Sequence, residues 1–252
     1  TSMLSEILSS LVFIFLCCCF VTAFSQQKNG ENSPPKVTII TPTVNSKLNW
    51  NSTIPYTIHV SDPEDGNSEY NEIAGNEVLL VIKYVPDSTQ VKKYLLERSK
   101  MNHQPLTWMS TSTCFTCHAA RSKLIGPSFD LVSQRYRGRL NAEDSLAKKI
   151  INGSTGTWGD LKIPPHPDLK VEQVREIVRW ILTNNDDPNE NYMAGIQGAF
   201  RTREKPVKDP KGVYVLIASY TDHGTKDPQH TDANAQRGTK VGQQSIVLKN
   251  ID

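Results

Sequence analysis

Hydrophobic residues follow two different periods along the chain, and the first is typical of strands. Val, Ile, Tyr and Thr recur at short intervals between Thr-Pro, Asn-Ser and Asp-Gly clusters, which are common turn sequences. This pattern predicts antiparallel strands at Val37–Ile40, Ile54–Val60 and Val78–Val85. The same character returns near the end of the chain, at Gly212–Asp222 and Ser245–Leu248.

The segment from residue 102 to residue 184 has a helical period instead. Its apolar positions predict amphipathic helices at Phe129–Tyr136, Glu143–Ile151 and Val171–Leu182. The last of these carries one apolar stripe, formed by Val171, Val174, Ile177, Val178 and Ile181. The chain therefore passes from β to α and back to β.

This order of elements suggests how the domains are connected. Three early strands cannot close a sandwich, and two late strands cannot form a stable sheet alone, because isolated hairpins are marginal in water. We therefore expect an α+β multi-domain protein in which a small all-α domain is inserted at a connection within one β-sandwich. The alternative is a linear β–α–β string whose last piece starts a further domain.

Composition narrows the class of protein. The chain has 252 residues, 28 Lys and Arg against 26 Asp and Glu, and 37% hydrophobic residues. This balance excludes wholesale disorder, collagen, coiled coil and a multi-span membrane protein. A net charge of +2 provides no electrostatic footprint for nucleic acid. The length predicts one or two domains.

The first 25 residues read as a targeting segment. Residues 11–24 form an apolar run too short to span a bilayer comfortably, and it ends in Ala23-Phe24-Ser25, a pattern that signal peptidase cuts. We interpret residues 1–25 as a signal peptide and residues 26–35 as a linker, which predicts an exported protein. The preceding residues include Glu6 and no Lys or Arg, so an uncleaved membrane anchor or a lipid-modified cysteine remains an alternative.

Three of the five cysteines, Cys17 to Cys19, lie in that run, which leaves only Cys114 and Cys117 downstream. These two belong to Cys114-Phe115-Thr116-Cys117-His118, the CxxCH signature of c-type haem attachment. Two thiols one helical turn apart add to the haem vinyl groups, and the adjacent His is the proximal axial ligand of the iron. The alternatives are a thioredoxin-type redox pair, half of a zinc site and a short disulfide.

Residues 106–184 resemble class I monohaem cytochromes c, especially the short bacterial electron carriers. The motifs that carry this resemblance are CxxCH, Lys123–Pro127, Ile150–Gly159, Pro164-Pro165 and a closing helix that contains Trp180. The resemblance implies that the carbonyl of Pro127 accepts the Nδ1–H of His118 and fixes its tautomer. It also implies that Trp158 packs beside the haem edge and propionate, although an ordinary core role would account for this residue equally well.

The sequence departs from this family at the second axial ligand. The family places a methionine directly before Pro-Pro, where this chain has Ile163, and an isoleucine cannot bind iron. Three outcomes remain open. His166 binds the iron, which we favour; another side chain, Met101, Met109 or Met193, reaches it; or the iron stays five-coordinate. The choice matters because axial ligands set the reduction potential and an open iron admits small ligands.

The β segments resemble bacterial immunoglobulin-like domains. Pro35–Pro42 and Val60–Gly66 resemble the opening strands of such domains, and Gly212–Asp222 resembles their penultimate strand. We therefore assign residues 36–100 and 200–252 to an immunoglobulin-like sandwich and residues 101–190 to the cytochrome domain. Similar combinations occur as tails of secreted quinoprotein sugar dehydrogenases, which implies a redox partner protein or domain of that kind.

Two polar loops raise the question of other ligands. Ser61–Glu69 contains four carboxylates. We interpret this segment as a solvated acidic turn, with a Ca²⁺ site as the less favoured alternative. Thr221–Asp232 contains His223 and His230 and reads as an exposed loop. No pattern typical of a hydrolase occurs.

The function that these features predict is single-electron transfer outside the cytoplasm by one covalently bound haem c, in a protein that is not itself an enzyme. A first alternative is a haem ligand sensor or peroxidase-like enzyme, in which His166 serves at an open iron. A second is a carbohydrate-binding or adhesive module with an accessory haem. That module would need a surface platform of exposed aromatic residues such as Trp50, Tyr70 and Tyr192.

Overall fold

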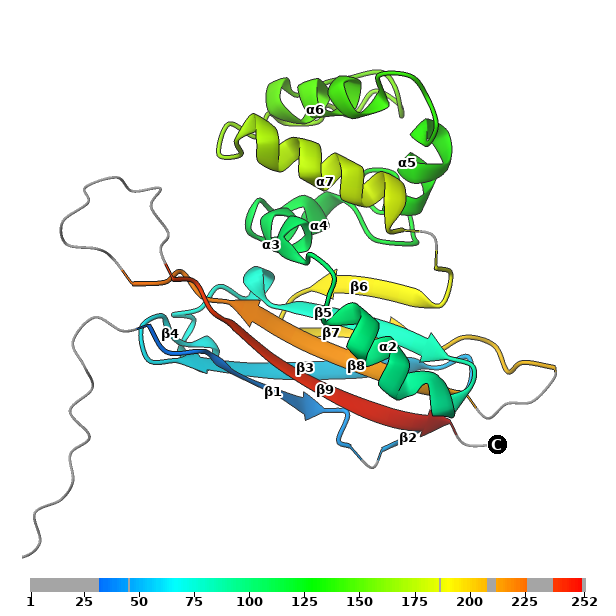
Figure 1. The fold of residues 1–252 in the computed structure, drawn as a ribbon. Helices are drawn as coiled ribbons and strands as arrows, with labels where there is room; N and C mark the ends of the chain where they lie inside the picture. Colours follow the sequence, from blue (N-terminus) through cyan, green and yellow to red (C-terminus); the bar gives the residue numbers. More distant parts are fainter. Residues whose placement is uncertain (1–31, 45, 186, 208–211, 226–237, 251–252) are drawn as a thin grey trace, which may run out of the picture. The chain divides into compact units, whose positions relative to one another are not determined.

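A computed structural model describes residues 32–252 except 45, 186, 208–211, 226–237 and 251–252 (Figure 1). The predicted signal peptide, residues 1–25, and most of the predicted linker therefore lie outside the described residues. Among the residues that are described, no helix has the length and apolar character needed to cross a membrane.

The strands form two sheets. The first, sheet A, contains β1 (Lys36–Thr41), β3 (Thr53–Asp62), β4 (Gly66–Asn67) and β7 (Gln197–Arg201). β1 pairs with one edge of β3, and β4 and β7 pair antiparallel with its two ends. The second, sheet B, has the order β2 (Lys47–Leu48), β9 (Val241–Asn250), β8 (Val213–Thr221), β5 (Leu79–Val85), β6 (Glu190–Ala194), antiparallel except for β2 with β9.

The five predicted strands correspond to β1, β3, β5, β8 and β9. β6 and β7 were not predicted, and they extend the sheets into residues 190–201. β6 reads Glu-Asn-Tyr-Met-Ala and β7 reads Gln-Gly-Ala-Phe-Arg, so neither has the alternation of a strand. β6 pairs with β5 and β7 pairs with β3, so both strands are formed by long-range pairing.

The central strands of sheet B, β5 and β8, are buried on both faces. Leu80, Ile82 and Tyr84 of β5 point toward sheet A, where they pack with Tyr56 and Leu216 in the core between the sheets. The alternate residues of the same strand, Leu79, Val81 and Val85, pack into a second apolar cluster on the opposite face. Strands buried on both faces read as continuous apolar runs, which is the pattern of β5 and of β8.

The second cluster is formed with the helices that lie between β5 and β6 in the sequence (Figure 1). These helices are α2 (Val91–Arg98), α3 (Gln104–Thr111), α4 (Cys114–Cys117), α5 (Phe129–Tyr136), α6 (Ala142–Asn152) and α7 (Val171–Thr183). Short 3₁₀ turns cover 68–70, 75–77 and 88–90. The three predicted helices are α5, α6 and α7. α7 buries Val174, Ile177, Val178 and Ile181, but Val171 in its first turn is 44% exposed.

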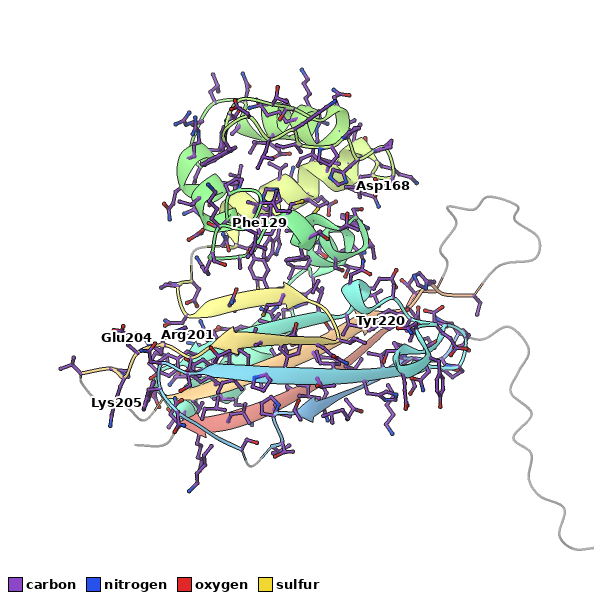
Figure 2. All side chains as sticks on the ribbon, turned by 180° about the vertical axis from the view of Figure 1, so that it is seen from behind. Phe129, Asp168, Arg201, Glu204, Lys205 and Tyr220 are labelled. Atoms are coloured by element: carbon purple, nitrogen blue, oxygen red, sulfur yellow. The ribbon has the colours of Figure 1, made fainter. Side chains whose placement is uncertain are left out.

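Aromatic residues connect the helices to sheet B. Phe129, at the start of α5, is buried and belongs to the same apolar cluster as Tyr192 of β6 (Figure 2). Trp180 of α7 packs against Tyr192 with the ring centroids 5.0 Å apart. The helical segment therefore shares a continuous apolar interior with the sandwich.

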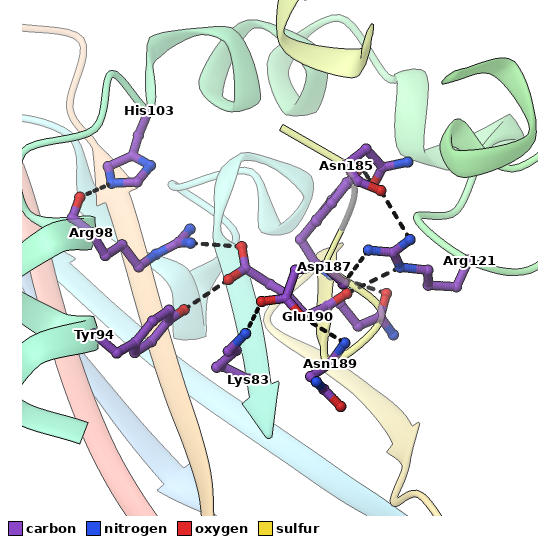
Figure 3. Close-up of polar contacts among 11 residues, drawn as sticks. Lys83, Tyr94, Arg98, His103, Arg121, Asn185, Asp187, Asn189 and Glu190 are labelled. Carbon is purple, nitrogen blue, oxygen red and sulfur yellow. Dashed lines mark hydrogen bonds and ion pairs between the residues drawn. The ribbon is translucent and has the colours of Figure 1, made fainter. Parts of the chain in front are cut away.

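Polar contacts hold the two ends of the helical segment together at sheet B (Figure 3). Arg98, at the end of α2, forms an ion pair with Glu190 at 2.7 Å, and Tyr94 donates to the same carboxylate at 3.0 Å. Lys83 of β5 pairs with Asp187. The Arg121 guanidinium donates to the backbone carbonyls of Asn185, Asp187 and Glu190. We call these residues the seam cluster: Lys83, Tyr94, Arg98, Arg121, Asp187 and Glu190.

Candidate haem site

The CxxCH motif forms a single helical turn and its exit. α4 spans Cys114–Cys117, and the His118 N–H donates to the Cys114 carbonyl at 3.0 Å. His118 itself is extended, with φ −124° and ψ 136°, so the chain leaves the helix at the histidine. Both cysteines are free thiols and are partly buried. Cys114, Cys117 and His118 all line the same cavity.

The ring of His118 is held by three neighbours. Its Nδ1 lies 2.6 Å from the carbonyl oxygen of Pro127, so the Nδ1–H donates there and Nε2 keeps its lone pair. A Cβ on Gly126 would lie 2.4 Å from His118 Cε1, which leaves room only for glycine. The Phe129 ring stacks on the imidazole at 5.3 Å. Burial is the main cause that lowers the pKa of His118 below its ordinary value.

The cavity has a volume of about 470 Å³ and an apolar lining. This volume lies within the range of about 300–1,000 Å³ for sites that enclose an organic ligand. The apolar lining includes Met109, Leu146, Val178 and Ile181. Burial raises the pKa of the Cys114 thiol to about 11. The donor set, two thiols and one imidazole of fixed tautomer in an apolar chamber, fits a covalently attached haem.

One loop, residues 153–169, forms another part of the cavity wall. Ile163 exchanges two backbone hydrogen bonds with Ser154, at 2.7 and 3.2 Å, and the backbone N–H of His166 donates to the Ile150 carbonyl at 3.1 Å. A Cβ on Gly153 would lie 2.6 Å from the Ile163 carbonyl oxygen, so glycine permits this close approach. Ile163 and His166 both line the cavity.

Trp158 also lines the cavity and is 36% exposed. The Arg135 guanidinium lies 4.7 Å from the centroid of its ring, at cation–π distance. Trp158 is therefore a residue of the cavity rim and not of the core between helices.

The structure separates the candidates for a second iron ligand. His166 and Met109 line the cavity, and Met109 is fully buried. Met101 is 41% exposed, and Met193 packs against the core between the two sheets; neither lines the cavity. The predictions that Met101 or Met193 would reach the iron are therefore not supported.

The two polar loops meet at one end of the sandwich. Asp65 accepts a hydrogen bond from Tyr220 at 2.7 Å, and the ring of His223 lies 3.1 Å from Asp65 and 3.3 Å from Glu77. We call Asp65, Glu77, Tyr220 and His223 the end cluster. Asp62 accepts from the backbone N–H groups of Glu64 and Asp65.

These contacts bear on the predicted Ca²⁺ site, because one oxygen of Asp62 and one of Asp65 already accept from donors of the protein. Within the described residues, no group of three or more His, Cys, Asp and Glu could hold a metal ion. Ca²⁺ is therefore not supported. His230 lies outside the described residues.

The aromatic platform expected for a carbohydrate-binding module is not formed by the residues named for it. Tyr192 is 3% exposed, and Trp50 packs edge-on against Tyr84 at 5.9 Å beside the core between the sheets. Tyr70 is exposed, at 69%. Because Tyr192 is buried and Trp50 is half-buried, these three rings do not form the exposed platform that this alternative requires.

Sequence reasoning missed the residues that support the His118 side of the cavity. The sequence pattern places Phe129 only in a helix, and it offers Tyr192 only as one ring of the platform that the carbohydrate-binding alternative requires. The available signal is the apolar character of residues 78–85, interrupted only by Lys83, and of residues 213–218, which indicates a sheet covered on both faces.

Comparisons with known proteins agree with this geometry. The cytochrome c family profile matches residues 107–185. Cytochrome c-551 of Azotobacter vinelandii is 42% identical over 74 residues, which are 29% of this chain and 89% of that protein. Cytochrome c-551 of Pseudomonas aeruginosa is 30% identical over 89 residues, 35% of this chain and 85% of that protein.

Among solved structures, wild-type cytochrome c552 of Nitrosomonas europaea aligns with 30% of this chain and 93% of its own, at 31% identity and a TM-score of 0.29. The chain belongs to the cytochrome c family. The matched residues contain the CxxCH turn, Pro127, Trp158 and His166, and they end before β6.

Proposed function

We propose that this protein carries single electrons on one haem c bound covalently by Cys114 and Cys117, with His118 as the proximal ligand. The observation that carries this proposal is that the three side chains line one apolar cavity while the Pro127 carbonyl fixes the His118 tautomer. When bound, the haem supplies the one-electron chemistry. The protein would hold the His118 imidazole, exclude water from the cavity and determine which molecules reach the haem from outside.

We propose His166 as the second axial ligand. Its side chain lines the same cavity as His118. Asp168 Oδ1 lies 3.9 Å from His166 Nδ1, and the other oxygen of Asp168 accepts from Ser112 at 2.7 Å. This carboxylate would orient the imidazole once the ring turns toward the iron.

One observation favours a second function. Ile163 occupies the methionine position of the family, lines the cavity and is fixed by two backbone hydrogen bonds to Ser154. If His166 does not bind the iron, the site is open on one side and would bind CO, NO or peroxide. That outcome would make the protein a ligand sensor or a peroxidase-like enzyme.

We propose that a redox partner docks at the mouth of the cavity. Ile125 and Leu161 line the cavity and are 55% and 66% exposed, so apolar surface surrounds the opening. Lys123 and Lys162 also line the cavity and add positive charge. Such a rim suits an acidic partner with a small apolar centre. A quinoprotein dehydrogenase, as a separate protein or a neighbouring domain, is the partner class that we propose.

We further propose that the protein is exported and that its strands form an immunoglobulin-like sandwich interrupted by the cytochrome domain. The apolar run and the Ala23-Phe24-Ser25 site support export. The pairing of β6 with β5 and of β7 with β3 supports a domain boundary near residue 186 in place of residue 200. Mass spectrometry of the mature N-terminus tests the first part of this proposal.

The central test is spectroscopy of the full chain, expressed together with a haem-attachment system. Pyridine haemochrome analysis should show one covalent haem in the wild type and none after combined Cys114→Ala and Cys117→Ala. The reduced wild type should have a low-spin spectrum that CO leaves unchanged. No covalent haem in the wild type would overturn the proposal.

The second ligand is tested by His166→Ala, with Met109→Leu as a matched control at the other candidate. We expect His166→Ala to become high-spin and to bind CO rapidly, and Met109→Leu to keep the wild-type spectrum. If Met109→Leu becomes high-spin and His166→Ala does not, Met109 is the ligand. If the wild type itself binds CO rapidly, the sensor or peroxidase function is favoured.

A further inference from the structure

Tyr192 is the one residue of β6 that reaches the aromatic group beside the haem cavity. It is 3% exposed and pairs with Val81 of β5 in sheet B. Its ring lies nearly parallel to that of Phe129, with centroids 6.2 Å apart and an interplanar angle of 24°. Phe129 in turn stacks on His118 at 5.3 Å and 28°. The three rings form a continuous stack from the sandwich to the proposed iron ligand.

Other contacts fix the Tyr192 ring in this position. Phe115, within the CxxCH motif, contacts it edge-on at 5.9 Å, and Trp180 contacts it edge-on at 5.0 Å. The Tyr192 hydroxyl donates to Asn185 Oδ1 at 2.8 Å. The backbone carbonyl of Asn185 accepts from Arg121 of the seam cluster at 3.0 Å. Strand pairing, the ring contacts and this hydrogen bond together hold the Tyr192 side chain in one position.

Tyr192 lies outside the part of the chain that matches the cytochrome c family, which ends at residue 185. The other three aromatic residues, Phe115, Phe129 and Trp180, lie inside it. The sandwich therefore contributes a ring to the His118 side of the cavity that the matched segment does not contain.

We propose that Tyr192 is a positioning residue for the haem: it backs Phe129, and through Phe129 it holds the His118 ring in one orientation and keeps water away from it. This inference rests on the proposed function, because it assumes that His118 binds the haem iron. The apolar surroundings and hydrogen bonding of an axial ligand tune the reduction potential. Water on this side of the cavity would stabilise the more charged oxidised iron and lower the potential.

The test compares three variants of the haem-loaded full chain. Tyr192→Leu removes the ring, Tyr192→Phe removes only the hydroxyl, and Phe200→Leu removes an equally buried ring from the core between the sheets, which has no contact with the cavity. The readouts are the reduction potential and the hyperfine-shifted NMR signals of the haem methyl groups, which report the orientation of the axial imidazole.

We expect Tyr192→Leu to lower the potential and to shift the methyl signals, and Tyr192→Phe and Phe200→Leu to leave both at their wild-type values. The inference is overturned if Tyr192→Leu loses thermal stability while its potential and methyl signals stay unchanged, or if Phe200→Leu changes them equally. Should Tyr192→Leu not fold, Tyr192→Met, whose flexible side chain fills irregular space, is held to the same criteria. Failure of the wild type to attach haem would instead overturn the proposed function.

Discussion

The Arg98–Glu190 pair of the seam cluster and the His223 pairs of the end cluster are ion pairs that differ in burial. In the seam cluster, the side chains of Arg98 and Glu190 are 9% and 17% exposed. In the end cluster, the side chain of His223 is 47% exposed, although its partners Asp65 and Glu77 are largely buried. Both clusters join residues that are far apart in the sequence.

This difference in burial determines what each cluster can do. Water cannot replace a buried pair, so the Arg98–Glu190 pair fixes the start of β6 beside the end of α2 and thereby the position of Tyr192, two residues further on. A half-exposed histidine exchanges protons with solvent, so the end cluster makes stability depend on pH. The first cluster therefore lies where the helical segment joins sheet B, and the second lies at one end of the sandwich.

The largest effect is expected for Arg98→Ala. This change leaves the Glu190 carboxylate buried with Tyr94 as its remaining partner, and breaking a buried pair costs about 3–5 kcal/mol. Urea unfolding of the full chain measures the loss. The double variant Arg98→Met with Glu190→Leu should recover most of it, because no charge is then left unpaired. If Arg98→Ala lowers the free energy of unfolding by less than about 1 kcal/mol, the Arg98–Glu190 pair does not behave as a buried pair.

A smaller effect is expected for Arg121→Ala. Its guanidinium donates to three backbone carbonyls, but its side chain is 25% exposed, so water would replace part of these bonds. We expect a loss of about 1–3 kcal/mol, in the range for hydrogen bonds to a charged group. Hydrogen exchange should be faster at the amides of residues 187–192 and unchanged in β9. An equal increase of hydrogen exchange in residues 187–192 and in β9 would mean that Arg121 stabilises the whole domain and not the segment that it contacts.

His223→Gln should destabilise the protein in a manner that depends on pH. Hydrogen bonding to Glu77, with a further contribution from Asp65, raises the pKa of His223 to about 9. Because this pKa is raised above the unfolded value of about 6.5, the stabilisation is complete below pH 6.5 and is lost as the pH rises through 9. Solvent exposure keeps it below about 1 kcal/mol.

Thermal unfolding of the wild type and of His223→Gln at pH 6 and pH 10 checks this prediction. The difference in Tm should be present at pH 6 and absent at pH 10. An equal difference at both pH values would show that the ring acts by packing and not by charge.

The smallest effect is expected for Arg179→Ala on the exposed side of α7. Its pair with Glu143 has a distance of 2.7 Å, as short as the Arg98 pair, but its side chain is 58% exposed. Exposed pairs contribute little, so we expect a change within about 0.5 kcal/mol in the same urea experiment. A loss as large as that of Arg98→Ala would show that distance, and not burial, decides the contribution.

Elements with local signals can be predicted from the amino-acid sequence alone. The strands β1, β3, β5, β8 and β9 and the helices α5 to α7 follow from the period of their apolar residues. The cytochrome class follows from CxxCH with the Gly126-Pro127 pair, because the thiols, the histidine and its carbonyl partner lie within fourteen residues of one another.

Features that depend on pairing between distant residues appear only in the folded chain. β6 and β7 have no strand pattern and exist because β5 and β3 pair with them. Because β6 pairs with β5, Met193 packs against the core between the sheets and Tyr192 lies behind Phe129. These positions depend on contacts between residues 63 to 148 positions apart in the sequence, and no local period records such contacts.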